Sequence, residues 1–380
     1  MEVRNTDILV VGENINSLYL CRILKNLGRD ILLLSQNRAA MLTNPVFKYY
    51  EDNAERYKVL NDSISKYLTE LGIYHKPSFS PISVVNPFGE ISEFTAISKT
   101  HNFYEYSTKS GSTLHFFIFE NVENCLDVPE SNIFKFEKLR LRVLDSNRMY
   151  SPYEVAKILD EDSEAVLSIA KNIKQNLKSN NSIAVLPPIL GIETTDRIIQ
   201  KIRENIDTEV FESIPLNPAV QSRRFYNTLD REFEKEGINR IYSRILRVEQ
   251  NGSKITSIIT ERYEIRPRIV VLMTERFVEE GLTIRDNTVV EPIFNLPVFF
   301  DNNKNELPYF TEEDILADHN IYSCGIRIDE SFSPLDIFNN TIFENLKCCG
   351  SIINGNRDNL LTLYNTHRLS EILRDGGNRR

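Results

Sequence analysis

The stretch "DILVVGENINSLYLCRILKNLGRDILLLS", residues 7–35, decides the fold of this chain. An apolar first strand reaches a turn at Gly12, an amphipathic helix follows and closes at Gly28, and a second apolar strand occupies Ile31–Leu34. A strand, a helix and a strand joined by such short connections form a βαβ unit, in which the two strands run parallel. The N-terminal part of the chain is therefore predicted to be an α/β domain built on a parallel sheet.

The turn of this unit keeps the frame of a dinucleotide-binding loop but only the first of its three glycines. In such loops the glycines permit a tight turn, let the backbone approach a pyrophosphate, and let helix and strand pack closely. The equivalent positions here hold Gly12, Asn14 and Ser17. Asn14 occupies space that a pyrophosphate needs, and Glu13 adds a like charge at a cost on the order of 1 kcal/mol. We therefore predict that the fold is retained and that the cofactor site is degenerate.

The composition is that of a folded, acidic protein. With 380 residues, of which 41% are hydrophobic, the chain can form two domains or one large domain with an insertion. A formal net charge of -9, with acidic residues spread along the chain, disfavours a nucleic-acid partner. The longest apolar runs, such as residues 269–273, have the length of strands, so no membrane-spanning helix is predicted. The start, MEVRNTDILVVG, runs into the first strand without a leader, which predicts a cytoplasmic protein whose membrane contact, if any, comes through a partner.

Residues 76–194 differ in character from the N-terminal unit. The stretches "GSTLHFFIFENV" and "KFEKLRLRVLD" alternate aromatic and β-branched residues and predict strands joined by turns. Residues 151–177 have a helical pattern with Ser151 as N-cap, and residues 182–192 contain a buried strand that ends at two prolines. We interpret 76–194 as an inserted α+β domain, on the substrate side or the partner side of a Rossmann-like domain.

That Rossmann-like domain is predicted to comprise residues 1–75 and 195–380. Helical patterns that flank or follow the insertion lie at residues 53–71, 194–205 and 222–236. An Asn251-Gly252 pair marks a hairpin, and a short apolar strand at Ile269–Met273 follows it. This last strand is predicted to run back into the sheet of the N-terminal βαβ unit.

Six further motifs carry a resemblance to a known family. They are "AVLPPILGIE" (184–193), "SIPLNPAVQSRRFYNTLDREFEKEG" (213–237), "IRPRIVVLMTERFVEEGL" (265–282), "EPIFNLPV" (291–298), "CGIRIDESFSP" (324–334) and "ENLKCCGSIING" (344–355). In order and spacing they resemble the B subunits of anaerobic glycerol-3-phosphate dehydrogenases, within the fumarate-reductase-like flavoprotein superfamily. The resemblance covers nearly the whole chain, although none of the motifs is decisive alone.

The resemblance implies a fold, a cofactor and partners. It implies a Rossmann-like FAD/NAD(P)-binding domain and a cytoplasmic subunit of a quinone-linked complex that oxidises glycerol 3-phosphate. The partners it implies are a catalytic flavoprotein subunit and an iron-sulfur subunit that attaches the complex to the membrane. The cofactor would be FAD or FMN, and no metal is expected. The positions that would border the flavin are Gly12, Asn14, Ser17, Ser35, Thr274, Gly350 and Gly355.

The sequence departs from the family pattern at three further places around the same cofactor. The second strand ends in Ser35 and Gln36, where an acidic residue would bind a ribose hydroxyl. The returning strand is followed by Thr274-Glu275-Arg276 rather than by small residues. The C-terminal helix has other residues where glycines are expected, namely Thr362, Tyr364, Asn365 and Thr366, and a side chain the size of tyrosine would fill that slot. FMN, which lacks the adenylate half, is left open as a ligand of a rearranged pocket.

Two functions follow, in different classes. The first is a structural or electron-relay subunit of a glycerol-3-phosphate dehydrogenase-like complex with a degenerate flavin site. The alternative is a non-catalytic scaffold or interaction protein that kept the fold without the cofactor. A stand-alone enzyme is disfavoured because no nucleophile, base or metal cluster stands out, and the catalytic residues are unknown.

The remaining candidate residues each have two interpretations. Cys348 and Cys349 are either thiolate ligands of an iron-sulfur cluster or buried strand cysteines. Arg223 and Arg224 either clamp a phosphate or carboxylate, or form exposed pairs with Asp230 or Glu234. The histidines show no metal spacing, and only the last lies near the flavin-side helix, where it could act as acid or base; they are His75, His101, His115, His319 and His367.

Overall fold

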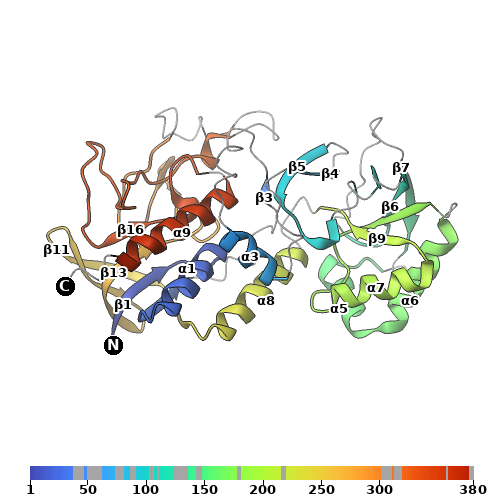
Figure 1. Ribbon diagram of the computed structural model, residues 1–380, viewed down its shortest axis with the longest axis horizontal. Helices are drawn as coiled ribbons and strands as arrows, with labels where there is room; N and C mark the ends of the chain where they lie inside the picture. The colour runs from blue at the N-terminus through green and yellow to red at the C-terminus, as the bar shows by residue number, and fades with distance from the viewer. Residues whose placement is uncertain are drawn as a thin grey trace. The chain divides into compact units, whose positions relative to one another are not determined.

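The computed structural model describes most of the chain in two compact units (Figure 1). The described residues are 1–36, 47–48, 62–72, 81–85, 91–101, 104, 107–108, 111–123, 136–142, 148–177, 181–214, 220–300, 310–311, 319–356 and 358–375. Unit 1 comprises Met1–Ala40, Asp52–Tyr67 and Leu229–Arg380, and unit 2 comprises Met41–Glu51 and Leu68–Thr228. Each unit is described by itself below.

A seven-stranded sheet forms the centre of unit 1. Its strands are β1 (Glu2–Val11), β2 (Ile31–Ser35), β10 (Asn239–Tyr242), β11 (Ile245–Asn251), β12 (Lys254–Thr260), β13 (Tyr263–Leu272) and β16 (Leu346–Cys348). The order is β10-β2-β1-β13-β12-β11, and β16 also pairs with β13. The strands β10, β2, β1, β13 and β16 are mutually parallel, whereas β11, β12 and β13 form an antiparallel meander. The predicted βαβ unit, the Asn251-Gly252 hairpin and the return of the later strand to β1 are all confirmed.

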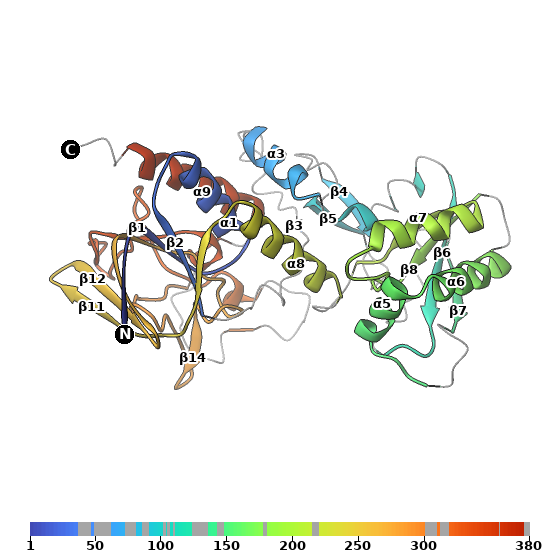
Figure 2. The same ribbon diagram turned by 90° about the horizontal axis from the view of Figure 1, so that it is seen from below.

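Helices cover this sheet because their apolar sides need burial. Helix α1 (Ile15–Asn26) follows β1, and helix α9 (Asn359–Asp375) lies beside it in both views (Figures 1 and 2). On the sheet, strand residues such as Leu9, Leu34 and Val270 are almost fully buried in a core that they share with Phe294 and Phe343. Helix α3 (Asp62–Glu70) lies within the predicted helix at 53–71, whose first residues fall outside the described part. A small hairpin, β14 (Thr283–Arg285) with β15 (Thr288–Val290), and two 3-10 turns, η5 (Asn320–Tyr322) and η6 (Gly350–Ile352), complete the unit.

Unit 2 has its own sheet, and this sheet is parallel. It has the order β7-β6-β8-β9, with β6 (Thr113–Phe119), β7 (Phe136–Leu141), β8 (Ser182–Leu186) and β9 (Glu209–Glu212). A three-stranded antiparallel sheet of β3 (Phe47–Lys48), β5 (Ile91–Ala96) and β4 (Ile82–Val85) accompanies it, with the 3-10 turn η3 (Lys99–His101). Where the sequence predicts strands joined by turns, β6 and β7 therefore run parallel.

The helices of unit 2 are α5 (Pro152–Glu161), α6 (Ser163–Asn176) and α7 (Thr195–Ile206), and α8 (Val220–Lys235) begins in it. The helical pattern at residues 151–177 is confirmed, but it forms two helices and not one. Asp162 has an extended backbone, ends α5, and accepts hydrogen bonds from the N–H groups of Glu164 and Ala165, so it caps a new helix. The predicted N-cap at Ser151 is confirmed.

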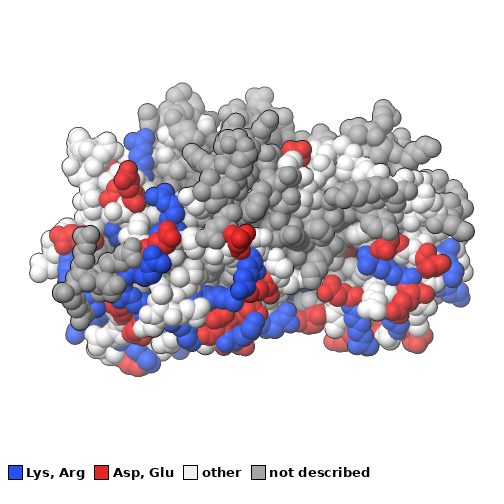
Figure 3. Space-filling model, in the orientation of Figure 1, with Lys and Arg blue, Asp and Glu red and all other residues white. Residues whose placement is uncertain are grey.

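The division of the chain differs from the predicted boundaries at several points, since Met41–Glu51 and residues 68–75 of the predicted dinucleotide-binding domain fall in unit 2. Residues 195–228 lie in unit 2, whereas the sequence placed them with the dinucleotide-binding domain. The physical reason is that β9 pairs with β8, so α7 must cross over the same sheet. On the visible face, basic and acidic side chains are interspersed over the described surface (Figure 3). No described helix is both long and apolar enough to cross a membrane.

Candidate functional site

The predicted site lies where β1 ends and α1 begins, and Gly12 is required there by packing. Its φ is 114°, and a side chain at this position would place its Cβ 2.7 Å from the backbone carbon of Met273 and the nitrogen of Thr274. A glycine therefore lets β1 and the end of β13 approach each other closely. This requirement holds without any ligand.

Asn14 is the N-cap of α1. Its Oδ1 accepts hydrogen bonds from the N–H groups of Asn16 (3.0 Å) and Ser17 (3.2 Å). The hydroxyl of Ser17 in turn accepts from the N–H of Asn14 at 2.8 Å, which completes a capping box. These N–H groups at a helix N-terminus are the ones that hold a phosphate in a dinucleotide site. Here they are engaged by the chain's own side chains.

Glu279 brings a carboxylate to the same place. Its Oε1 accepts from the N–H of Glu13 at 2.9 Å, and its Oε2 accepts from Asn14 Nδ2 at 3.0 Å. The N–H of Glu275 also donates to Oε2, at 2.7 Å. Burial raises the pKa of Glu279 to about 7, and the neighbouring Glu275 carboxylate adds to the increase. A protein carboxylate therefore lies at the N-terminus of α1, close to where a pyrophosphate would approach.

Glu13 is paired, which corrects the expectation that its charge is free to repel an anion. Its Oε1 accepts from Arg240 Nη1 and from the hydroxyl of Tyr242, both at 2.9 Å. Arg240 also contacts Asp230 at 2.5 Å and Glu234 at 3.8 Å. The expected partners of Arg223 and Arg224 are thus engaged by an arginine on β10, and Glu13 is held by a guanidinium instead of facing an open site.

The end of β2 is tied to the segment that follows β10. Ser35 is buried, and its carbonyl accepts from the N–H of Ser243 at 3.0 Å. The side chain of Gln36 accepts from the N–H of Ile245, also at 3.0 Å. Ser35 thus lies at the carboxyl end of β2, as predicted. Gln36, the next residue, binds a backbone N–H group of the same unit.

The loop after β13 is tied to the C-terminal part of unit 1. Arg276 donates to three backbone carbonyls, those of Cys324 (2.8 Å), Ile353 (3.0 Å) and Asn356 (2.7 Å). Glu275 accepts from the hydroxyl of Ser351. The residues that replace the expected small-residue turn therefore act as cross-links within the fold.

Of the C-terminal site positions, Gly350 lies beside the end of β13, since a Cβ at Gly350 would be 3.7 Å from the carbonyl oxygen of Met273. Gly350 follows β16 with a φ of 88°, and Gly355 has a φ of 72°. In α9 the side chains packed inside are Thr362 and Thr366, which are almost fully buried, and the Thr366 hydroxyl lies 3.5 Å from Cys349 Sγ. Tyr364 is only partly buried, and the filling of this region by its side chain stays a prediction.

Four buried oxygens at this edge have no hydrogen-bond partner among the residues that the structure describes. They are Glu13 Oε2, Asn16 Oδ1, Ser243 Oγ and Thr274 Oγ1. They follow β1, β10 and β13, the strands whose carboxyl ends meet here. Two are pure acceptors and two are hydroxyls, so the edge keeps unused acceptors while the N–H groups of Glu13, Asn14, Asn16 and Ser17 are bonded.

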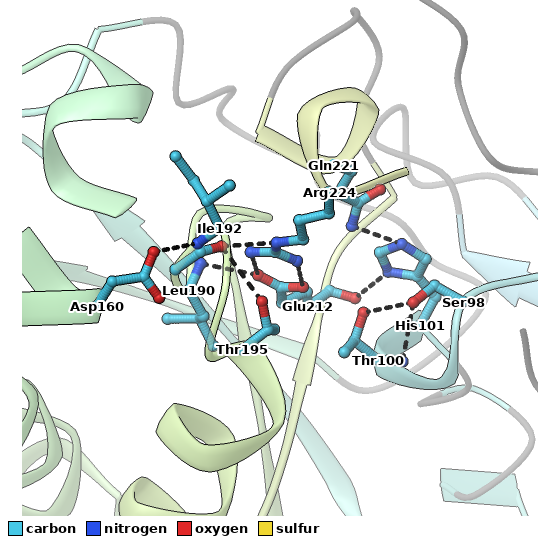
Figure 4. Close-up of polar contacts among 11 residues, drawn as sticks. Ser98, Thr100, His101, Asp160, Leu190, Ile192, Thr195, Glu212, Gln221 and Arg224 are labelled. Atoms are coloured by element: carbon cyan, nitrogen blue, oxygen red, sulfur yellow. Dashed lines mark hydrogen bonds and ion pairs between the residues drawn. The ribbon is translucent and has the colours of Figure 1, made fainter. Parts of the chain in front are cut away.

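A second polar cluster lies in unit 2, where β8 and β9 end (Figure 4). Glu212 is fully buried and accepts from Arg224 through both oxygens, at 2.6 and 2.9 Å, and from the N–H of Leu190. Although burial alone would raise the pKa of Glu212, the paired guanidinium lowers it. Arg224 therefore clamps a carboxylate through two parallel contacts, and that carboxylate belongs to its own chain. The interpretation of Arg224 as an exposed pair with Asp230 or Glu234 is wrong, because its side chain is only 13% exposed.

His101 completes this cluster as an engaged core histidine. Its Nδ1 lies 3.0 Å from the carbonyl oxygen of Glu212, and its Nε2 lies 2.6 Å from Gln221 Nε2. Burial lowers the pKa of His101, which favours the neutral ring. Both ring nitrogens are used, so the contacts in Figure 4 account for His101 as a link between η3, β9 and α8.

Asp160 repeats in unit 2 the arrangement found at α1. Its carboxylate accepts from the N–H groups of Ile192 (2.7 Å), Glu193 (3.1 Å) and Thr194 (2.9 Å), in the loop between β8 and α7. Thr194, the N-cap of α7, makes no capping bond with its own side chain. A carboxylate from a different element therefore satisfies the backbone at this helix start.

The remaining histidines and cysteines make structural contacts. His115 contacts Ser182 at 3.0 Å, and His367 contacts the Tyr19 hydroxyl at 3.1 Å; His75 lies outside the described residues. Cys348 and Cys349 are buried free thiols whose pKa values burial raises, as the strand interpretation expects. Among the described residues, no group of three or more histidines, cysteines and acidic residues is placed to hold a metal ion.

The parallel order β10-β2-β1-β13, with α1 after β1 and a glycine at the turn, defines a Rossmann-type dinucleotide-binding fold. Within that class the chain resembles the B subunit of anaerobic glycerol-3-phosphate dehydrogenase. It is 23% identical over 230 residues to the protein of that name from Pasteurella multocida, covering 59% of this chain and 52% of the relative. It is 26% identical over 216 residues to that from Haemophilus ducreyi, covering 55% and 49%. The chain thus spans about half the length of the curated relatives it matches.

Solved structures of flavoenzymes are more distant. A 3-ketosteroid dehydrogenase from Rhodococcus jostii is 8% identical and aligns over 100% of this chain and 98% of its own, with a TM-score of 0.37. A flavocytochrome c3 fumarate reductase is 11% identical, over 98% and 78%, with a TM-score of 0.36. No family model matches the chain.

Proposed function

We propose that this protein is a structural subunit of a glycerol-3-phosphate dehydrogenase-like, quinone-linked complex, and that its dinucleotide cradle is degenerate. The likeness to the B subunits of such dehydrogenases supports the first part. The observation that carries the second part is the bonding at the start of α1. The N–H groups of Glu13, Asn14, Asn16 and Ser17 all donate to side chains of the protein itself.

A pyrophosphate does not fit this arrangement. It carries two negative charges, and it would have to displace side chains such as Glu279 and Asn14 from buried positions before gaining the N–H groups of Glu13, Asn16 and Ser17 as donors. The oxygens left without a partner are acceptors or hydroxyls, which do not replace those donors.

The partners in this proposal are a catalytic flavoprotein subunit and an iron-sulfur subunit that attaches the complex to the membrane. The protein itself is cytoplasmic in this proposal, and its membrane association comes through the iron-sulfur subunit. Its contribution is then to assembly and not to the oxidation of glycerol 3-phosphate.

A second candidate function is an electron relay through FMN in a rearranged pocket. The four unpartnered buried oxygens favour it, because Thr274, Ser243, Asn16 and Glu13 leave hydrogen-bonding capacity at the carboxyl ends of the strands. FMN also lacks the adenylate half and needs fewer contacts than FAD.

Flavin titration separates the two functions. The wild-type chain, Asn14→Gly/Glu279→Ala and the control Glu261→Gln would be titrated with FAD and with FMN while flavin fluorescence is followed. Glu261 is exposed and lies on a turn between β12 and β13. We expect no saturable binding by the wild type or the control, and weak binding gained by the double variant. Stoichiometric FMN binding by the wild type would establish the relay, and stoichiometric FAD binding would overturn the degenerate cradle.

A further inference from the structure

A separate cavity in unit 1 has the composition of an anion site. Its volume is about 410 Å³. Polar side chains from three segments line it, namely Gln36 after β2, Arg244 and Arg247 around the start of β11, and Glu280, Thr283 and Arg285 near β14. Three arginines against one glutamate leave the lining with an excess of positive charge.

Two of these arginines are not used by the fold. Arg247 pairs with Glu249 at 2.9 Å. Arg244 and Arg285 make no side-chain hydrogen bond or ion pair with any residue in the described part of the chain. Most other arginines named above, such as Arg224, Arg240 and Arg276, have charged or carbonyl partners. Two guanidinium groups in one cavity are therefore available to a ligand.

The other lining groups indicate what kind of ligand. The Gln36 Oε1 accepts from the Ile245 N–H, which leaves the amide NH2 of Gln36 as a further donor. Thr283 and Glu280 can bond hydroxyl groups, and Ile245, Pro292 and Ile293 add apolar lining. A guanidinium matches the oxygens of a phosphate with two parallel N–H groups. The volume is in the range of small-molecule sites, roughly 300 to 1,000 Å³, and exceeds what an isolated phosphate ion needs.

We propose that this cavity binds a phosphomonoester with a hydroxylated body, whose phosphate is held by Arg244 and Arg285. The body lies against Ile245 and Ile293, and its hydroxyls meet Glu280 and Thr283. The site does not use the N–H groups at the start of α1, so it is independent of the dinucleotide cradle. The proposal stands whether or not the chain is a dehydrogenase subunit. Both a sugar or glycerol phosphate and a nucleoside monophosphate have this chemistry.

Calorimetric titration of the full chain tests the site. The probes are glycerol 3-phosphate, AMP, inorganic phosphate and succinate. We expect the wild type to bind glycerol 3-phosphate or AMP at least tenfold more tightly than inorganic phosphate or succinate. Whichever of these two phosphomonoesters binds more tightly shows whether the ligand is a sugar or glycerol phosphate or a nucleoside monophosphate. Arg244→Gln and Arg285→Gln should each weaken that binding by about tenfold, as expected for loss of one charge-assisted contact. Both arginines are exposed, so these variants should keep the wild-type unfolding temperature.

A matched control is Arg262→Gln, another exposed arginine of unit 1, on the turn between β12 and β13. It should bind like the wild type. The charge-preserving pair Arg244→Lys/Arg285→Lys should still lose affinity, because lysine cannot bind two phosphate oxygens in parallel. The proposal is overturned if neither phosphomonoester binds, if succinate binds equally well, or if Arg262→Gln weakens binding as much as the other two.

Discussion

At the scale of single residues, Glu279 is the side chain that most distinguishes the start of α1 from a dinucleotide-binding loop. It reaches the N–H of Glu13 across 266 residues of sequence. An anion at a helix N-terminus is favourable because the backbone N–H groups and the helix dipole point toward it. Here a carboxyl group of the chain takes that place, and because its pKa is raised to about 7 it is mainly an anion only above that pH. No local pattern predicts this contact, since Glu279 stands in an ordinary acidic loop between β13 and β14.

The raised pKa of Glu279 predicts how stability depends on pH. The pKa is about 7 in the folded protein against an ordinary 4.5, so the folded state binds the proton more tightly than the unfolded chain. The free energy of unfolding should therefore fall by up to about 3 kcal/mol as pH rises from the ordinary pKa of 4.5 to the folded pKa of about 7, and it should level off at higher pH. Glu279→Gln should flatten this decline in urea unfolding curves measured from about pH 5 to about pH 8.

The control for that measurement is Glu261→Gln, which changes an exposed carboxylate and should keep the wild-type slope. Glu291, whose pKa burial raises to about 6, contributes to the lower part of the window in both variants. An unchanged slope in Glu279→Gln would mean that the carboxylate is already ionised across the whole range.

The pairing of Glu13 with Arg240 makes a second prediction at this scale. Glu13 is 3% exposed, so Arg240→Ala would leave a buried carboxylate without its guanidinium. We expect a loss of about 3 kcal/mol in the free energy of unfolding. The exposed pair of Arg247 with Glu249 provides the comparison, and Arg247→Ala should cost less than about 1 kcal/mol. Equal losses in the two variants would show that Arg240 does not neutralise Glu13.

At the scale of elements, the start of α1 shows which structural features could be predicted from the sequence and which could not. Apolar periodicity predicted β1, α1 and β2 correctly, because each buries a face that its residues define. The same residues identified Asn14 as an obstacle to a pyrophosphate. What they could not show is how this cap is tied to the rest of the fold, since Asn14 Nδ2 donates to Met273 and Glu279 on a distant part of the chain.

Asn14→Ala should therefore cost more than an ordinary loss of a helix cap. Ser151, the N-cap of α5, accepts one backbone hydrogen bond, and Ser151→Ala should cost about 1 kcal/mol. Asn14 accepts two and donates two, at a buried position, so Asn14→Ala should exceed that loss by roughly 1 kcal/mol or more. Thermal unfolding of both variants measures the difference. If the two variants lose the same free energy of unfolding, Asn14 acts only as a cap of α1, and its bonds to Met273 and Glu279 add no stability.

At the scale of the whole molecule, the α/β class and the return of β13 to β1 could be predicted, while the organisation of the second unit could not. The apolar runs of β6, β7 and β8 are compatible with either parallel or antiparallel pairing, and the structure pairs β6 in parallel with both β7 and β8. The break at Asp162 was missed for a related reason: the helical periodicity of residues 151–177 continues across it, and only the capping bonds reveal two helices.

The carboxylate of Glu279 has a further consequence for how this protein is made. A chain that needs a nucleotide to neutralise its helix start becomes more stable as that nucleotide accumulates, by mass action. This chain supplies the neutralising group during its own folding. Under the function proposed above, unit 1 would therefore mature in cells that are poor in flavin, and its supply to the complex would be uncoupled from vitamin metabolism.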